Sequence, residues 1–442
     1  MKRFSELGIH VPEILLPAAL DTGTWPVIAC DQYTQDRRYW EEVAARVGAR
    51  PSALRVIFPE VYLNDGGRNE RIEAVRNAMR EYLSSSVFAP PRRGFVYVER
   101  KTAYGRTRKG LVAAIDLEAY EWKPFSTALV RATEATIVGR IPPRMEIRRG
   151  APLELPHIML LADDASKTFV EAVGARAKAS GADVLYDGAL MMNGGSISGW
   201  AVDSPELLES ARGALERLAA EHQAADGSTF LFAVGDGNHS LATAKAVWEE
   251  RKAERIAAGA SAGELADDPV RYALVEIVNI YDDGLTFEPI HRVFFHADAG
   301  VLVEWLAGRL GGRTERIADA ESLERRVKES SADFGFAFRK DGAPEYILLR
   351  TAVKDLAVAA FQPEADAFMK EHPGMDVDYI HGSAEVFRLG AAEGAVGVLL
   401  PPVAKDSFFQ TIGRRGPLPR KSFSMGEADE KRFYLECRRL FG

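Results

Sequence analysis

The chain has 442 residues, of which 47% are hydrophobic and 27% charged, and its formal net charge is -8. Such a length exceeds what one hydrophobic core organises, so we expect a globular protein of several lobes, and the acidic balance argues against a general nucleic-acid or acidic-membrane surface. Two distant cysteines, Cys30 and Cys437, without a Cys-x-x-Cys pair exclude a cysteine-based zinc site.

The N-terminal lobe is predicted to span residues 1–125. Apolar runs of strand length and one long apolar helix face fill it. The predicted strands are Pro26–Cys30, Leu54–Phe58, Phe95–Val98 and Gly110–Ile115, and the helix runs from Asn69 to Leu83.

A central lobe is predicted over residues 126–296. Its strands are Pro156–Leu161, Val184–Asp187, Ser198–Val202, Phe230–Val234 and Arg271–Tyr281, and its helices are Lys167–Ala179 and Pro205–Ala225. The mixture of strands and helices predicts the α/β class with mixed sheets.

Two further parts complete the predicted organisation. Residues 297–355 have the pattern of a small α/β insertion with a packing role or a homodimer contact, and residues 356–442 are expected to pack back on the core. The alternation in Phe433–Leu440 predicts a terminal strand. No window approaches the ~20 apolar residues that span a bilayer, and no signal-peptide core is present, so we expect a soluble, cytoplasmic protein.

One stretch organises the candidate chemistry. The strand Phe230–Val234 leads into Gly235-Asp-Gly-Asn-His-Ser240, and a helical pattern follows from Leu241. Gly235 and Gly237 allow positive φ or a close approach to a ligand, and Asn238 or Ser240 can cap the helix. Helix N-terminal amides are unpaired and attract anions. The alternative is an ordinary turn that contains a histidine.

A dense group of arginines precedes this stretch. Arg131, Arg140, Arg144, Arg148 and Arg149 fall within nineteen positions, with Glu134 among them. The guanidinium fork binds phosphate and carboxylate bidentately, which favours an anion-binding array. A solvated face or internal salt bridges would use the same residues.

Three histidines have similar surroundings: His239, His291 and His381. With Asp236 or Asp31 they could form a metal site, although no His-x-x-x-His spacing supports one, and a histidine bonded to backbone is the simpler alternative. The chain has no Gly-x-Ser-x-Gly, no Walker motif and no Gly-x-Gly-x-x-Gly, which argues against α/β-hydrolases, P-loop ATPases and Rossmann dehydrogenases.

Phosphate chemistry by another route needs backbone donors, cations, carboxylates for Mg²⁺ and a base. The loop Gly235–Ser240 offers the donors. The other candidates are the cations Arg131, Arg292, Arg420 and Lys421 and the carboxylates Asp31, Glu134 and Asp236. Each also has an ordinary role as a turn acid, a cap or a surface cation.

Motifs along nearly the whole chain resemble the bacterial and archaeal family called domain of unknown function 1015. The loop Gly235–Ser240 is similar to the family's Asp-Gly-His-His-Arg hallmark. The other matching motifs are Val27–Thr34, Arg131–Thr136, Pro289–Arg292, Tyr379–Gly382 and Leu418–Ser422. The family name implies no activity.

The hallmark loop also looks like the signature of the ParB/sulfiredoxin fold, in which a strand, a loop and a helix bind nucleotide phosphates. That superfamily includes a CTP-hydrolysing partition protein, a sulfinic acid reductase and a free-serine kinase. Here Asn238 replaces the first histidine and Ser240 the arginine. The resemblance therefore implies nucleotide binding only if Arg131 or Arg292 supplies the missing cation.

Together these features predict an enzyme that binds a nucleotide or phosphorylated metabolite and carries out Mg²⁺-dependent phosphoryl transfer or hydrolysis on a small hydroxylated metabolite. In this hypothesis Asp236 and His239 contact phosphate or metal, and Glu134 or Asp31 acts as base. The ligand site is completed by four cations and two histidines: Arg131, Arg292, Arg420, Lys421, His291 and His381. The alternatives are a non-catalytic sensor of a small anion and, with less support, a nucleic-acid or protein-interaction module.

Overall fold

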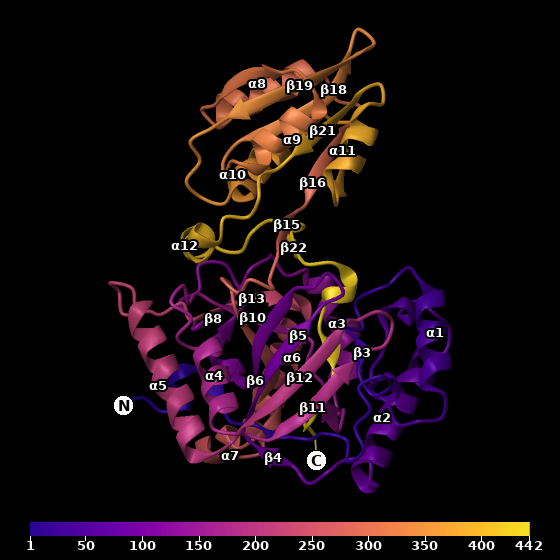
Figure 1. Cartoon of the computed structure of the whole chain (residues 1–442), viewed down its shortest axis with the longest axis vertical. Helices are drawn as coiled ribbons and strands as arrows, with labels where there is room; N and C mark the ends of the chain where they lie inside the picture. The colour runs from indigo at the N-terminus through magenta and orange to yellow at the C-terminus, as the bar shows by residue number, and fades with distance from the viewer. Residues whose placement is uncertain (442) are drawn as a thin grey trace. The chain divides into compact units, whose positions relative to one another are not determined.

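The protein is described by a computed structural model in which residues 1–441 are defined (Figure 1). The chain divides into two compact units. Unit 1 comprises Met1–Trp122, Ser126–Leu285 and Glu427–Gly442, and unit 2 comprises Lys123–Phe125 and Thr286–Gly426. This division differs from the predicted lobes, because strands from residues 1–125 and from residues 126–296 share one sheet.

Unit 1 is built on a ten-stranded mixed sheet, in agreement with the predicted α/β class. Strands β10 and β14, β8 and β13, and β7 and β8 pair in parallel, whereas the other neighbours are antiparallel. In sheet order the strands are β11 (Val184–Ala189), β12 (Ser196–Val202), β5 (Phe95–Lys101), β6 (Thr107–Asp116), β14 (Tyr272–Asn279), β10 (Met159–Ala162), β13 (Phe232–Asp236), β8 (Val130–Ala132) and β7 (Tyr120–Glu121), with β1 (Ile9–His10) paired to β6.

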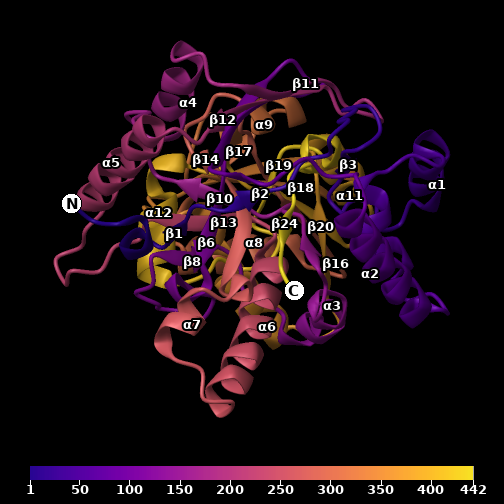
Figure 2. The same cartoon turned by 90° about the horizontal axis from the view of Figure 1, so that it is seen from below.

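Both faces of this sheet are buried. Along β5, Phe95 and Tyr97 enter one apolar cluster while Val96 and Val98 enter the other, because successive side chains of a strand point to opposite faces. This explains why the strands read as continuous apolar runs. One face is covered by α3 (Ile141–Arg148), α4 (Val170–Ala179), α5 (Pro205–Glu221) and α6 (Asn238–Ala257), and the other by α1 (Arg37–Val47) and α2 (Arg68–Ser84) (Figures 1 and 2).

Two predicted strands are wrong. Ala53–Val56 forms a 3-10 helix instead of a strand, because Ser52 Oγ accepts a hydrogen bond from Leu54 N and starts a turn. The segment from Phe433 is a strand only at β23 (Phe433–Tyr434) and β24 (Arg438–Arg439). Between them Leu435 O accepts from the Trp25 indole, so the strand is interrupted.

Unit 2 contains a six-stranded antiparallel sheet with a core of its own. In sheet order its strands are β17 (Arg313–Ile317), β19 (Ala343–Arg350), β18 (Phe334–Lys340), β21 (Ala395–Leu399), β16 (His291–Phe295) and β20 (Asp376–Ile380). Its helices are α8 (Ala299–Arg309), α9 (Ala320–Lys328), α10 (Ala357–Glu371), α11 (Ser383–Gly390) and α12 (Lys405–Arg415), and β15 (Phe287–Pro289) pairs with β22 (Phe423–Met425). Within residues 1–441, no helix is both long enough and apolar enough to cross a membrane.

Candidate functional site

The loop Gly235–Ser240 joins β13 directly to α6. Gly237 is the N-cap of α6 and has φ +79°, so the helix begins at Asn238 and the cap is neither Asn238 nor Ser240. A Cβ at position 237 would lie 3.1 Å from Ile158 Cα. Glycine is therefore required both for the left-handed backbone and for the close approach to the residue before β10.

The segment after β8 braces this loop. Thr133 N donates to Asn238 Oδ1 at 3.2 Å, and Thr133 Oγ1 donates to Val234 O at 2.6 Å. Ile137 N donates to His239 Nε2 at 3.3 Å, so this ring nitrogen acts as a hydrogen-bond acceptor. The predicted motif Arg131–Thr136 and the predicted loop are thus adjacent, and the half-buried Glu134 lies between these bracing residues in sequence.

Asp236 forms an ion pair with a residue that the sequence did not indicate. Lys431 Nζ lies 3.3 Å from Asp236 Oδ2, and the lysine side chain is only 12% exposed. Gly237 N donates to the other carboxylate oxygen at 2.9 Å. A cation is therefore held at the start of α6 by the C-terminal segment of the chain.

A polar network lies on another side of the first turn of α6. Ser240 Oγ and His157 Nε2 are 2.8 Å apart, and His157 Nδ1 is 2.8 Å from Tyr434 OH. Tyr434 OH donates to Cys30 Sγ at 3.0 Å. Asp31 Oδ2 lies 3.9 Å from His157 Nε2. Asp31 and Ser240 are thus brought to one histidine that the sequence analysis had assigned only to a buried strand.

A cavity of about 150 Å³ borders this network. Its polar lining includes Ser240, His157, Cys30 and the ion pair between Glu60 and Arg144. The remaining wall is largely apolar and includes Phe58, Met79, Leu153, Ile158 and Leu274.

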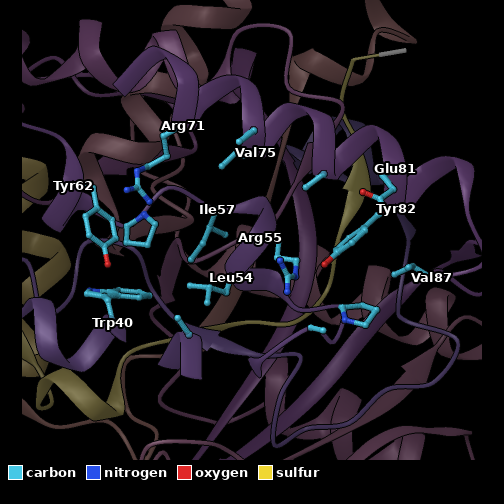
Figure 3. A pocket seen from close by; sticks show the side chains of 16 residues that line it. Trp40, Leu54, Arg55, Ile57, Tyr62, Arg71, Val75, Glu81, Tyr82 and Val87 are labelled. Carbon is cyan, nitrogen blue, oxygen red and sulfur yellow. The ribbon is translucent and has the colours of Figure 1, made fainter. Parts of the chain in front are cut away.

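A larger groove lies between α1 and α2, with a volume of about 580 Å³ (Figure 3). Tyr62 and Arg71 lie near one end, where the Arg71 guanidinium is 4.2 Å from the centre of the Tyr62 ring, and Glu81 and Tyr82 lie near the other (Figure 3). None of the predicted site residues lines this groove.

Arg131 extends away from the loop. Its guanidinium lies 4.5 Å from the centre of the Phe230 ring, and its Nε donates to Ala128 O at 2.9 Å. Phe230 precedes β13, whereas the loop follows that strand, so the side chain runs toward the opposite end of β13. Three other arginines of the predicted array form ion pairs with carboxylates: Arg144 with Glu60, Arg148 with Glu154, and Arg149 with Glu250.

The remaining predicted ligand residues belong to unit 2. Arg292 is fully buried there, with its Nε donating to Gln362 Oε1 at 2.8 Å and its guanidinium 4.5 Å from the Tyr379 ring centre. His291 is also buried and accepts from Leu400 N. His381, Arg420 and Lys421 are exposed on the surface of unit 2.

The described residues form no preassembled metal site, since residues 1–441 hold no group of three His, Cys, Asp or Glu side chains placed to bind one ion. Asp236, the predicted Mg²⁺ ligand, contacts Lys431 and Gly237 N instead. Mg²⁺ commonly needs only one or two carboxylates because substrate phosphates and water complete its shell. Asp236 therefore fits a metal that is bound together with a phosphorylated ligand.

Sequence reasoning missed His157, Lys431 and Tyr434. The only sequence signal for His157 was a polar residue at the start of the predicted apolar strand Pro156–Leu161. Lys431 and Tyr434 lie in the C-terminal segment, far from the loop in sequence. Their proximity depends on β23 pairing with β3 (Val27–Ile28).

A family model described as "Protein of unknown function (DUF1015)" matches residues 14–367. Among curated proteins, none matches the chain significantly. A conserved hypothetical protein from Pyrococcus furiosus is similar at 10% sequence identity and a TM-score of 0.35, with 74% of this chain and 94% of that chain covered.

Two further solved structures are similar at the same level. A free serine kinase in complex with AMP has 10% identity and a TM-score of 0.36, with 74% of this chain and 92% of that chain covered. SbnI from Staphylococcus aureus has 10% identity and a TM-score of 0.34, with 71% and 82% covered. These TM-scores are too low to transfer a ligand or an activity.

Proposed function

The chain belongs to the DUF1015 family, whose description gives no function, and we propose that it binds the phosphate groups of a nucleotide or phosphorylated metabolite at the N-terminus of α6. The observation that carries this proposal is the loop Gly235–Ser240, which starts a helix of 20 residues beside the Lys431 ammonium. Unpaired amides and the helix dipole attract anions at such a terminus. Lys431 adds a localised positive charge.

The reaction we propose is phosphoryl transfer to a small hydroxylated metabolite, or hydrolysis. Lys431 offsets phosphate charge, and His239 and Asp236 lie in the same turn as the phosphate-binding amides. Asp31, or alternatively Glu134, accepts the proton of the attacking hydroxyl. Asp236 would hold Mg²⁺ together with the phosphates, and the bound ion would neutralise charge on the phosphate oxygens.

Isothermal titration with ATP, ADP and CTP in the presence of Mg²⁺ tests the binding step. We expect one of them to release or absorb heat, and Lys431→Met to weaken that affinity about 10- to 100-fold, since a hydrogen bond to a charged group contributes about 1.5–3 kcal/mol. Lys2→Met is the matched control because this lysine is exposed and its backbone bonds to Glu216 and Arg212 of α5. The absence of heat with all three nucleotides at millimolar concentration would remove the proposal.

A second candidate is a non-catalytic sensor of a small anion at the same loop. The contacts that Asp236 makes with Lys431 and Gly237 N support it, because a carboxylate already paired with an ammonium is a weaker metal ligand. A sensor would be stabilised by its ligand without turnover. If the protein is a sensor, the Glu134→Gln variant should bind the anion with the same affinity as the wild type, and neither protein should show turnover.

A further inference from the structure

Ser240 has the surroundings of an activated nucleophile. It lies in the first turn of α6, and its Oγ is 2.8 Å from His157 Nε2. A hydroxyl at this distance from an imidazole nitrogen can lose its proton to that nitrogen as it attacks. The histidine lies two residues before β10 and the serine lies in α6, so two separate parts of the chain create the pair.

The second nitrogen of His157 fixes the direction of proton transfer. Tyr434 OH is 2.8 Å from His157 Nδ1, accepts from Cys30 N at 3.3 Å and donates to Cys30 Sγ at 3.0 Å. With the phenol proton directed at sulfur, as the contact with Cys30 Sγ permits, Nδ1 carries the proton that it shares with the phenol oxygen. Nε2 is then left as the acceptor for the hydroxyl of Ser240.

Two nearby features favour the products of such an attack. Asp31 Oδ2 lies 3.9 Å from His157 Nε2 and stabilises the imidazolium that forms. A phosphate on a residue in the first turn of a helix is favoured by the dipole and by the terminal amides. The adjoining cavity of about 150 Å³ leaves room for about five waters, at roughly 30 Å³ each, or for a small alcohol beside Ser240.

We propose that Ser240 accepts the phosphoryl group of a nucleoside triphosphate and forms a phosphoserine intermediate, an inference that rests on the proposed function. Ser240 Oγ bonds to the γ-phosphorus, the bond from that phosphorus to the β–γ bridging oxygen breaks, and the nucleoside diphosphate leaves. The proton of Ser240 moves to His157 Nε2. In the second step a hydroxyl in the cavity attacks the phosphorus, the bond to Ser240 Oγ breaks, and His157 returns its proton to Oγ. The proton of the attacking hydroxyl passes to Asp31, the base of the proposed function.

Mass spectrometry of the full chain after incubation with ATP and Mg²⁺ tests this step. We expect one added phosphate that peptide mapping places on Ser240, and no label in Ser240→Ala. His157→Gln should slow labelling by about 100-fold or more, which is the contribution of a general base. Ser240→Thr keeps a hydroxyl and should label on the new residue, so loss of label in Ser240→Ala is not a folding effect.

Ser204→Ala is the matched control, since Ser204 caps α5 through a bond from Leu207 N and should not affect labelling. Nucleotide binding by calorimetry together with an unlabelled chain, or with a label on another residue, overturns the phosphoserine intermediate and leaves the proposed function standing. Absence of both binding and label removes the proposed function and the intermediate with it.

Discussion

His291 is held as a neutral imidazole inside unit 2. It is 8% exposed, and Leu400 N donates to its Nδ1 at 3.1 Å, which a protonated ring could not accept. Burial, together with the adjacent Arg292 guanidinium, lowers the pKa of His291 to about 4. His291 therefore has a structural role as a buried hydrogen-bond acceptor, and this role requires no bound ligand.

This histidine should make unit 2 sensitive to acid. In the unfolded chain it protonates near pH 6.5, so its contribution to stability is fully present above that pH and is lost as the pH falls toward about 4. The full loss is roughly 3.4 kcal/mol, at about 1.4 kcal/mol for each unit by which the two pKa values differ. Denaturant titrations at several pH values should show this slope, and His291→Gln should flatten it because an amide accepts without titrating.

His296→Gln provides the comparison, since the side chain of His296 is 73% exposed and should leave the acid dependence unchanged. Equal pH dependence in the wild type and in His291→Gln would contradict the assignment of this residue.

At the scale of the element, the start of α6 depends on a glycine that packs against Ile158, the residue before β10. Gly237 and Gly67 are both N-cap residues with left-handed backbones, at φ +79° and +77°. They differ in their surroundings. A Cβ at 237 would meet Ile158 Cα at 3.1 Å, whereas at 67 the nearest atom is Glu70 Oε2 at 3.6 Å.

Gly237→Ala should therefore destabilise the protein more than Gly67→Ala. Both carry the cost of a left-handed non-glycine residue, about 1–2 kcal/mol, and only Gly237→Ala adds overpacking, about 1–3 kcal/mol. Urea unfolding measures the difference between the two variants. Gly237→Ala should also abolish the heat of nucleotide binding in calorimetry. Equal destabilisation by Gly237→Ala and Gly67→Ala would mean that the contact with Ile158 is not tight.

On the scale of the whole molecule, the C-terminal segment returns to unit 1 after the chain has completed unit 2. Arg432 anchors it at a buried position, 3.2 Å from Glu276 and 2.6 Å from Glu436. Lys431 and Tyr434 lie beside this anchor in sequence and reach Asp236 and His157. The site therefore requires both ends of the chain to be folded into unit 1.

Replacing Arg432 by Met should destabilise unit 1 alone. It leaves Glu276 and Glu436 buried with fewer cations, which costs about 3–5 kcal/mol, while the core of unit 2 contains no residue of this segment. Calorimetry should show one transition moved to lower temperature and the other unchanged. Arg439→Met, at an exposed neighbouring position of β24, should move neither, and a joint shift of both transitions would argue that the units unfold together.

The sequence by itself determined the α/β class and the strand, loop and helix around Gly235–Ser240, because apolar periodicity and glycine positions are local properties that survive any packing. It also placed Asp31 and Asp236 after strand-like runs. Sequence patterns failed at Leu54–Phe58, where a local serine turn prevailed over strand propensity.

Only the tertiary structure decided which of these residues meet. The pairs Ser240 with His157 and Lys431 with Asp236 join positions far apart in the chain, and no local pattern records that proximity. Burial also could not be predicted from the sequence, because an arginine is expected at the surface unless packing encloses it. Arg292 is such a buried arginine. Long-range sheet pairing is the physical reason in each unit: β23 on β3 brings the C-terminal segment into unit 1, and the position of β16 between β20 and β21 encloses Arg292 in unit 2.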